Sequence, residues 1–215
     1  MSNRHIIFDL DGTLTDSSEG ITNCIEYALI KMGIDVPDKK ALRKYIGPPL
    51  IPAFIEDYGM TESQANETLH FYRERFLDKG IYENKVYDGI SDMLDALKKA
   101  GRKILLATTK PEPQAITVLE HFSLIKYFDV ISGSTLDSKI VEKNDIIEVA
   151  FSRLPDARCD SVMVGDRKFD IWGAKHHKIQ SIGVLYGYGT REELQLAGAD
   201  ILVPTVDKLK ELLLN

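Results

Sequence analysis

The sequence of 215 residues lacks the usual marks of a secreted or membrane-spanning protein. It contains only two cysteines, Cys24 and Cys159, whose spacing is not that of a metal site, so we expect two reduced thiols and no disulfide framework. No apolar run approaches the ~20 residues that cross a bilayer. No long apolar run follows Arg4, so we expect no signal peptide. These absences together predict a cytoplasmic protein.

An excess of positive charge is also lacking. The chain carries 27 basic and 33 acidic side chains, a formal net charge of −6. This balance argues against nucleic acid or an anionic membrane surface as the main partner. It leaves small anions possible as ligands, because a metal ion or a local basic pocket can reverse the field. Hydrophobic residues make up 44% of the chain, the composition of an ordinary globular protein.

Two patterns of hydrophobicity divide the chain. Residues 5–8, and then residues 86 onwards, show short apolar runs that alternate with helical patterns. Alternation of this kind predicts a doubly wound parallel α/β sheet. We expect its strands at 5–8, 103–108, 128–133, 161–166, 180–187 and 200–203, and its helices at 88–101, 111–122, 142–154, 170–177, 191–198 and 205–214.

Residues 15–84 show helical patterns without a clear strand. Three segments, 17–33, 50–59 and 61–80, have apolar residues at helical spacing and end at glycine. Thr61 and Gln64 have the spacing of a capping box. We therefore expect an α/β core made of residues 1–14 and 85–215, with an all-helical cap domain of residues 15–84 inserted after the first strand.

Polar residues follow the predicted strands. In an open parallel sheet, ligands bind at the carboxyl ends of the strands, so these positions are the candidate site. They comprise Asp9 and Asp11 after the first strand, Thr108, Thr109 and Lys110 after the second, and Asp166 and Asp170 after the fourth.

The carboxylates of this edge require a counter-charge. Alternation along the strand turns Asp9 and Asp11 to the same side, and Asp166 should lie near them. Like charges this close need either raised pKa values or a bound cation. Because the set offers oxygen ligands without histidine or cysteine, we expect Mg²⁺. Gly12 permits a sharp turn that can present backbone N–H groups to an anion.

This combination suits phosphoryl transfer. One aspartate can attack phosphorus and form an aspartyl phosphate, and the other can act as general acid and then as general base. A hydroxyl and a cation must also hold the phosphoryl oxygens. Thr108 supplies the hydroxyl, whereas spacing alone does not decide between Lys110 and Lys143 as the cation.

At the level of motifs, DLDGTLTDS resembles the first motif of the haloacid dehalogenase superfamily, most of whose members are phosphatases. The later elements agree in order over essentially the whole chain: Thr108 at a strand end, Lys143 opening a helix, and VGDRKFD as the acidic motif. The segments YIGPPL, ATTKP and LYGYGTREEL are most similar to the phosphoglycolate phosphatase-like or 5′-nucleotidase-like branch. The resemblance implies a Rossmann-like core with a helical cap.

The resemblance also implies roles for the acidic residues. Asp9 would be the nucleophile and a metal ligand. Asp11 would be the general acid and base, with its backbone carbonyl on the metal. Asp166 would bind Mg²⁺, with support from Asp170 through water.

Further residues would bind substrate. The resemblance implies that Thr108 and Lys143 bind the phosphoryl group. Thr109 stands where many relatives have asparagine, which leaves a backbone contact in place but no defined side-chain role. In the segment LRKYIGPPL, Arg43 or Lys44 either meets a remote anionic group of the substrate or belongs to a solvated helix end, and the sequence favours neither interpretation.

We therefore expect Mg²⁺-dependent hydrolysis of a small organic phosphate monoester by a monomer or weak homodimer. Phosphoglycolate or a similar ester is the first candidate substrate, and a nucleoside 5′-monophosphate is the second. A phosphomutase is less favoured. The presence of Asp11 and of the acidic motif argues against a dehalogenase, and the intact Asp9 and Asp166 argue against a non-enzymatic binding module.

Replacing Arg43 with alanine distinguishes the two interpretations of that residue. If its guanidinium contacts a remote anion, kcat/KM for phosphoglycolate should fall about 10-fold or more, because a hydrogen bond to a charged group is worth about 1.5 kcal/mol or more. Hydrolysis of p-nitrophenyl phosphate, which lacks that anion, should be unchanged. Equal losses on both esters would favour the solvated helix end.

Overall fold

The structure is a computed structural model that describes residues 4–36, 38–137 and 139–215. The chain divides into two compact units. The first consists of the residues up to Asp16 together with Val86–Asn215, and the second is Ser17–Lys85. Two short strands, β2 (Thr15–Asp16) and β3 (Lys85–Val86), form a separate two-stranded sheet.

The first unit is built on a six-stranded sheet with the order β5-β4-β1-β6-β7-β8. Neighbouring strands are parallel, and β1 pairs with both β4 and β6, so it lies inside the sheet. The predicted doubly wound parallel α/β core is thereby confirmed. The strands are β1 (His5–Phe8), β4 (Lys103–Pro111), β5 (Val130–Ser134), β6 (Ser161–Gly165), β7 (Gln180–Val184) and β8 (Ile201–Val203).

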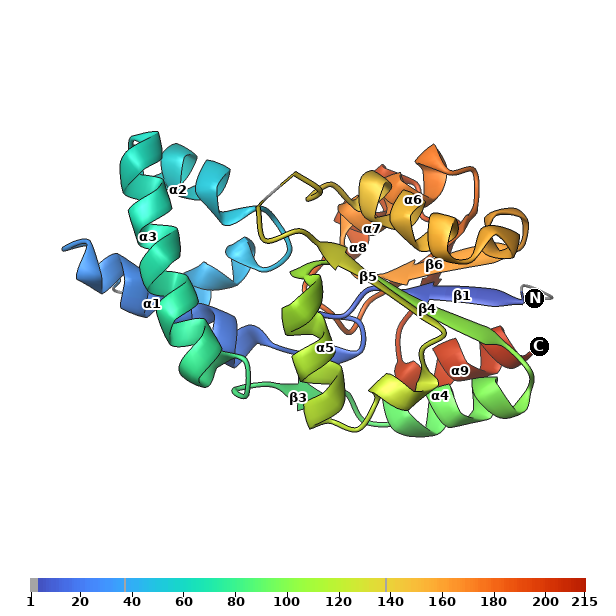
Figure 1. Ribbon diagram of the computed structural model, residues 1–215. Coiled ribbons are helices and arrows are strands. Elements are labelled where there is room, and N and C mark those ends of the chain that lie inside the picture. Colours follow the sequence, from blue (N-terminus) through green and yellow to red (C-terminus); the bar gives the residue numbers. More distant parts are fainter. Residues whose placement is uncertain (1–3, 37, 138) are drawn as a thin grey trace. The chain divides into compact units, whose positions relative to one another are not determined.

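Helices cover both faces of this sheet (Figure 1). One face carries α4 (Ile90–Lys99), α5 (Glu112–His121) and α9 (Val206–Leu214). The other carries α6 (Lys143–Arg153), α7 (Lys168–His176) and α8 (Arg191–Ala197). Short 3₁₀ helices, η3 (Ile125–Tyr127) and η4 (Pro155–Cys159), lie in the connections.

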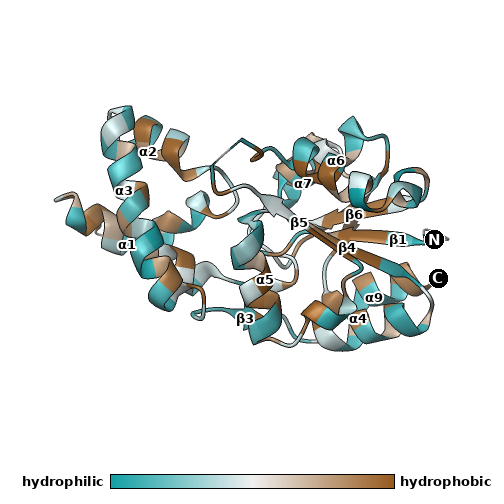
Figure 2. Cartoon of the chain, in the orientation of Figure 1, coloured by the Kyte–Doolittle hydropathy of each residue, from teal (hydrophilic) through white to brown (hydrophobic). Residues whose placement is uncertain are grey.

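The apolar runs of the strands are buried because helices shield them on both sides. Ile6, Ile7 and Phe8 of β1 have no exposed surface, and the central strands are the most hydrophobic segments in Figure 2. On the α6 face, Ile147 and Phe151 pack in one cluster with residues of β1, β4 and β6. Full burial of such a side chain stabilises the fold by about 1.5–3 kcal/mol, so this packing fixes the strand ends that carry the candidate site.

The second unit consists mainly of helices. They are α1 (Ser18–Lys31), η1 (Lys39–Tyr45), α2 (Leu50–Tyr58), α3 (Glu62–Arg75) and the π-turn η2 (Phe76–Gly80). The capping box is confirmed, since Gln64 N–H donates to Thr61 Oγ1 at 3.3 Å and Thr61 N–H donates to Gln64 Oε1 at 2.9 Å. The helix predicted over 61–80 ends at Arg75, where the chain widens into the π-turn η2, and Gly80 lies against Gly20 of α1.

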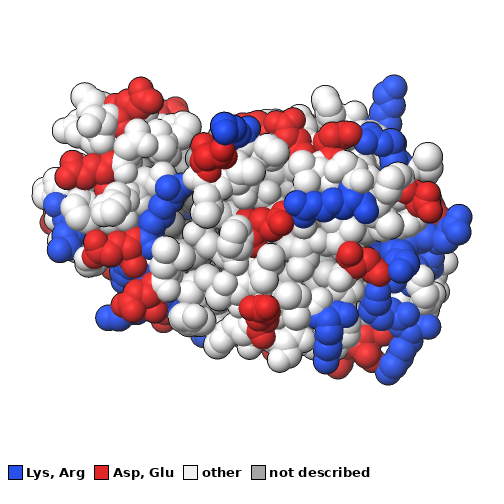
Figure 3. Space-filling model, in the orientation of Figure 1, with Lys and Arg blue, Asp and Glu red and all other residues white. Residues whose placement is uncertain are grey.

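Cys24 is buried, Cys159 is exposed, and neither forms a disulfide within the described residues. Across the described residues, none of the helices combines the length and apolarity that a bilayer crossing requires. Basic and acidic side chains are interspersed over the face of the first unit seen in Figure 3. Lys98 and Lys103 both form ion pairs with Asp129, at 2.7 and 2.9 Å.

A substitution at Gly20 tests the packing of the second unit. Alanine at an ordinary helix position is about 1 kcal/mol more stable than glycine, but a Cβ on Gly20 would overlap the carbonyl oxygen of Gly80. Gly20→Ala should therefore lower the free energy of unfolding, by about 1–3 kcal/mol in urea titrations. Gly33→Ala is the control, because nothing lies within 4 Å of its Cβ position and only its positive φ of 75° opposes the change. A stabilised Gly20→Ala would contradict this packing.

Candidate active site

The loop after β1 brings two aspartates to the carboxyl edge of the sheet. The carbonyl oxygen of Leu10 accepts the N–H groups of Leu14 and Thr15 at 2.9 and 3.0 Å, which closes a tight turn. Gly12 has a φ of 87°, and a Cβ there would lie 2.6 Å from Cγ of Asp166. Glycine is therefore required both by the backbone conformation and by the close approach to Asp166.

Three carboxylates meet at this edge. Asp9, Asp166 and Asp170 each offer an oxygen, these oxygens lie within 4.8 Å of one another, and all three residues are buried. Asp166 Oδ2 accepts Tyr188 N–H at 2.7 Å, and Asp170 Oδ2 accepts Arg167 N–H at 3.1 Å. These backbone donors hold two of the carboxylates in place.

Lys143 lies at the first position of α6 and reaches into the carboxylate cluster. Its Nζ is 2.9 Å from Asp9 Oδ1, 2.8 Å from Asp170 Oδ1 and 2.8 Å from the carbonyl oxygen of Ala107. An ammonium group has three N–H donors, and three acceptors surround this one. Lys143 therefore stabilises the carboxylates of Asp9 and Asp170.

A second lysine pairs with the remaining aspartate. Lys110 Nζ lies 2.9 Å from Asp11 Oδ2, and the two side chains are 5% and 13% exposed. Spacing along the sequence left Lys110 and Lys143 as alternatives. In the folded protein both reach the site, but they contact different aspartates.

The electrostatics of the cluster favour a bound cation. Burial raises the pKa of Asp9 to about 6, with Asp170 and Asp11 adding to the effect and Lys143 opposing it. Burial, reinforced by the charges of Asp170 and Asp9, also raises the pKa of Asp166 well above its usual range. For Lys143, burial alone would lower the pKa, but the neighbouring carboxylates outweigh it and the pKa lies above its ordinary value. One lysine does not balance three carboxylates.

The donor set fits a hard divalent cation. All three groups supply carboxylate oxygen, and histidine and cysteine are absent from the cluster. Such a set is suited to Mg²⁺ or a similar ion rather than to Zn²⁺ or Cu²⁺. Asp11 contributes no side-chain oxygen to the cluster, which leaves the metal contact expected through its backbone carbonyl as a prediction.

The remaining predicted residues lie in two places. Thr108 is buried near the end of β4, where its Oγ1 accepts Lys110 N–H at 3.2 Å, and Thr109 is half-buried beside it. Arg43 is exposed and belongs to η1 of the second unit. Lys44 forms an ion pair with Asp57 at 2.8 Å.

Sequence reasoning missed two contacts to Asp166. Besides Tyr188 N–H, the hydroxyl of Thr13 donates to Asp166 Oδ1 at 3.4 Å. The segment LYGYGTREEL was informative as a motif. The contact through the backbone N–H of Tyr188 could not be predicted, because it does not depend on the type of side chain.

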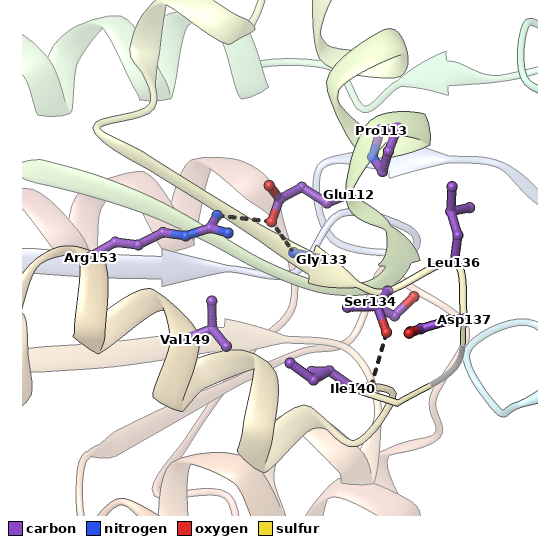
Figure 4. Close-up of a pocket in the computed structure, with 10 residues that line it drawn as sticks. Glu112, Pro113, Gly133, Ser134, Leu136, Asp137, Ile140, Val149 and Arg153 are labelled. Atoms are coloured by element: carbon purple, nitrogen blue, oxygen red, sulfur yellow. Dashed lines mark hydrogen bonds and ion pairs between the residues drawn. The ribbon is translucent and has the colours of Figure 1, made fainter.

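A pocket of about 450 Å³ lies beside β5 and is distinct from the carboxylate cluster (Figure 4). Residues of α5, β5, the loop after β5 and α6 line it. An ion pair between Arg153 and Glu112, 2.8 Å long, spans one side, and Glu112 Oε2 accepts Gly133 N–H at 3.3 Å. This arrangement fixes the start of α5 against β5.

This chain is similar to known proteins in sequence and in fold. The family model of the haloacid dehalogenase-like hydrolases matches residues 6–184. A 5′-nucleotidase of Pseudomonas aeruginosa is 42% identical over 89% of this chain and 86% of its own length. The tyrosine-protein kinase PtkA of Mycobacterium tuberculosis is 36% identical over 97% and 72%. The crystal structure of a predicted phosphatase from Clostridium acetobutylicum is 46% identical, with a TM-score of 0.93 over 99% of this chain and 98% of its own.

We expect Mg²⁺ to raise the melting temperature, Tm, by an amount that depends on pH. Because the pKa of Asp9 in the folded protein is about 6, above the usual ~3.9, the folded state binds this proton more tightly than the unfolded state. The cluster's contribution to stability is therefore largest below about pH 4 and is lost as the pH rises through about 6. A cation competes with the proton, so millimolar Mg²⁺ should raise Tm more at about pH 7.5 than at about pH 5.

Mass action gives the size of the expected stabilisation by Mg²⁺. At a Mg²⁺ concentration about 100-fold above Kd, the free energy of unfolding should rise by about 2.7 kcal/mol. Asp9→Asn should remove most of it, whereas Asp207→Asn, which changes an exposed carboxylate on α9, should keep it. An equal shift in Tm at both pH values would contradict cation binding by this cluster.

Proposed function

Because the chain belongs to the haloacid dehalogenase-like hydrolase family, we propose that this phosphatase hydrolyses a small organic phosphate monoester with Mg²⁺, through an aspartyl phosphate on Asp9. The observation that carries the proposal is the convergence of Asp9, Asp166 and Asp170 within 4.8 Å. A buried cluster of oxygen ligands suits Mg²⁺, and an aspartate beside it suits nucleophilic attack on phosphorus.

In the first half of the proposed reaction, a carboxylate oxygen of Asp9 attacks phosphorus. A bond forms between Asp9 and phosphorus, and the bond between phosphorus and the ester oxygen breaks. The departing oxygen takes a proton from Asp11, which leaves an alcohol, an aspartyl phosphate and the Asp11 carboxylate. Lys143, 2.9 Å from Asp9 Oδ1, holds the nucleophile in place before attack.

In the second half, Asp11 takes a proton from a water molecule whose oxygen attacks the phosphorus of the aspartyl phosphate. The bond between Asp9 and phosphorus breaks, inorganic phosphate leaves, and both aspartates return to their starting states. Lys143 supplies positive charge to the phosphoryl group, and Thr108 supplies a hydroxyl. Asp9 and Asp166, with support from Asp170, would hold Mg²⁺, which would supply further positive charge to the phosphoryl group.

Two substrate classes remain candidates. The motifs of the chain favour phosphoglycolate or a similarly small ester. The 42% identity to a 5′-nucleotidase supports nucleoside 5′-monophosphates as the second class to test. The rates of hydrolysis of purified esters of both classes, measured with Mg²⁺, distinguish the two substrate classes. The same assays in EDTA test the metal, and full activity there would contradict the metal assignment.

The helical unit Ser17–Lys85 is proposed to act as the cap that the family resemblance implies. A cap would exclude water and present side chains such as Arg43 to the organic part of the substrate. A cytoplasmic location and a monomer or weak homodimer remain predictions from the sequence.

Asp11→Asn is the sharpest test of the reaction. General acid–base catalysis contributes about 10²–10⁴-fold, so kcat on an alkyl phosphate should fall by at least ~10²-fold, while the rise in Tm with Mg²⁺ stays. With p-nitrophenyl phosphate, whose leaving group needs little protonation, the first turnover should lose much less. Stopped-flow measurement of the p-nitrophenol burst isolates that step from hydrolysis of the aspartyl phosphate.

Asp9→Asn supplies the contrasting result. Without the nucleophile, the first turnover should disappear for both esters, independently of the leaving group. An Asp11→Asn enzyme that turns over the alkyl phosphate at nearly the wild-type rate would exclude Asp11 as the general acid and base.

A further inference from the structure

Lys110 and Asp11 form an ion pair that is largely buried. The Nζ–Oδ2 distance is 2.9 Å, and 5% of the Lys110 side chain and 13% of the Asp11 side chain are exposed. Removing two charges from water costs several kcal/mol per ion, so a buried pair is weak evidence for stability. This cost suggests that the pair serves the geometry of the site.

The two oxygens of Asp11 differ in their surroundings. Oδ2 contacts Lys110. Oδ1 is buried and has no hydrogen-bond partner within the described part of the chain. A buried polar atom without a partner is rare in native proteins and requires an explanation, a catalytic role being one. Asp11 thus has one anchored oxygen and one oxygen left for another group.

The backbone places Lys110 through an irregularity in β4. Residues Leu105 to Thr108 pair in register with β5, ending with Thr108 opposite Gly133, but the next pair joins Pro111 to Ser134. Thr109 and Lys110 of β4 therefore have no paired residue on β5 and form a bulge. Bulges of this kind often lie beside active sites, where they redirect a side chain.

Gly133 makes room for this bulge. A Cβ at Gly133 would lie 2.7 Å from the carbonyl oxygen of Lys110 and 2.6 Å from the nitrogen of Glu112. Figure 4 shows Gly133 beside Glu112, with its N–H directed to the Glu112 carboxylate. Lys110 N–H also donates to Thr108 Oγ1 at 3.2 Å. The backbone of Lys110 is thus fixed on both sides.

We propose that Lys110 is a positioning residue, which anchors Oδ2 of Asp11 so that Oδ1 faces the oxygen that gains or loses the proton. This inference rests on the proposed function. Lys143 does not take this part, because its ammonium group contacts Asp9, Asp170 and the Ala107 carbonyl oxygen. Lys143 therefore holds the nucleophile, and Lys110 holds the general acid and base.

Lys110→Met is the first test, with Lys103→Met as its matched control. Lys103 lies on the same strand and forms an ion pair of the same length, 2.9 Å, with Asp129. Misplacement of a catalytic group by about 1 Å can cost ~10²-fold, so kcat of Lys110→Met on an alkyl phosphate should fall by about that factor. Inhibition by inorganic phosphate should be nearly unchanged, and Lys103→Met should retain wild-type kcat.

The double variant Lys110→Met with Asp11→Asn decides how Lys110 acts. If Lys110 works only through Asp11, adding Lys110→Met to Asp11→Asn should cause no further loss of kcat. Losses that multiply, or a phosphate inhibition constant that rises with Lys110→Met, would mean that Lys110 contacts the phosphoryl group directly, and would overturn the proposal.

Two measurements show whether a loss of kcat in Lys110→Met arises from destabilisation of the fold. The rise in Tm with Mg²⁺ reports an intact carboxylate cluster. Lys110→Arg, which keeps the charge, should recover part of the lost kcat. A Lys110→Met enzyme with wild-type kcat would refute the positioning role even where Asp11→Asn is inactive, and inactivity of the wild-type enzyme on every phosphate ester would refute the proposed function itself.

Discussion

Electrostatic repulsion among buried carboxylates is the constraint on which the site depends. Asp9, Asp166 and Asp170 lie within 4.8 Å and away from solvent, and Lys143 offsets only part of their charge. Burial raises the pKa values of Asp9 and Asp166, and repulsion from the neighbouring carboxylates adds to the rise. Buried carboxylates with raised pKa values, gathered in one place, are typical of a functional site.

The parallel sheet makes this concentration of charge possible. Because β1 lies between β4 and β6, the residues that follow all three strands meet at one edge. Backbone N–H groups and the close approach at Gly12 then hold the carboxylates together. Burial of β1 and the packing of α6 provide the stability that offsets the repulsion.

Much of the fold could be predicted from the sequence because local patterns determine it. The apolar run at 5–8, the start of α6 at Lys143 and the capping box at Thr61 agree with the structure. The predicted strand at 103–108 was too short, since β4 continues to Pro111. That extension contains a bulge, whose cause is pairing with β5 rather than any local preference of Thr109 or Lys110.

The sequence by itself determined which chemical groups stand at the strand ends, and in what order: Asp9 and Asp11, then Thr108 and Lys110, then Lys143, then Asp166 and Asp170. Only the tertiary structure decided which of them pair. Lys143 meets Asp9 across 134 positions of sequence, and Lys110 meets Asp11 instead. Spacing fixes where a residue lies along its own strand or helix, but the reach of a side chain between elements depends on how strands register and helices pack.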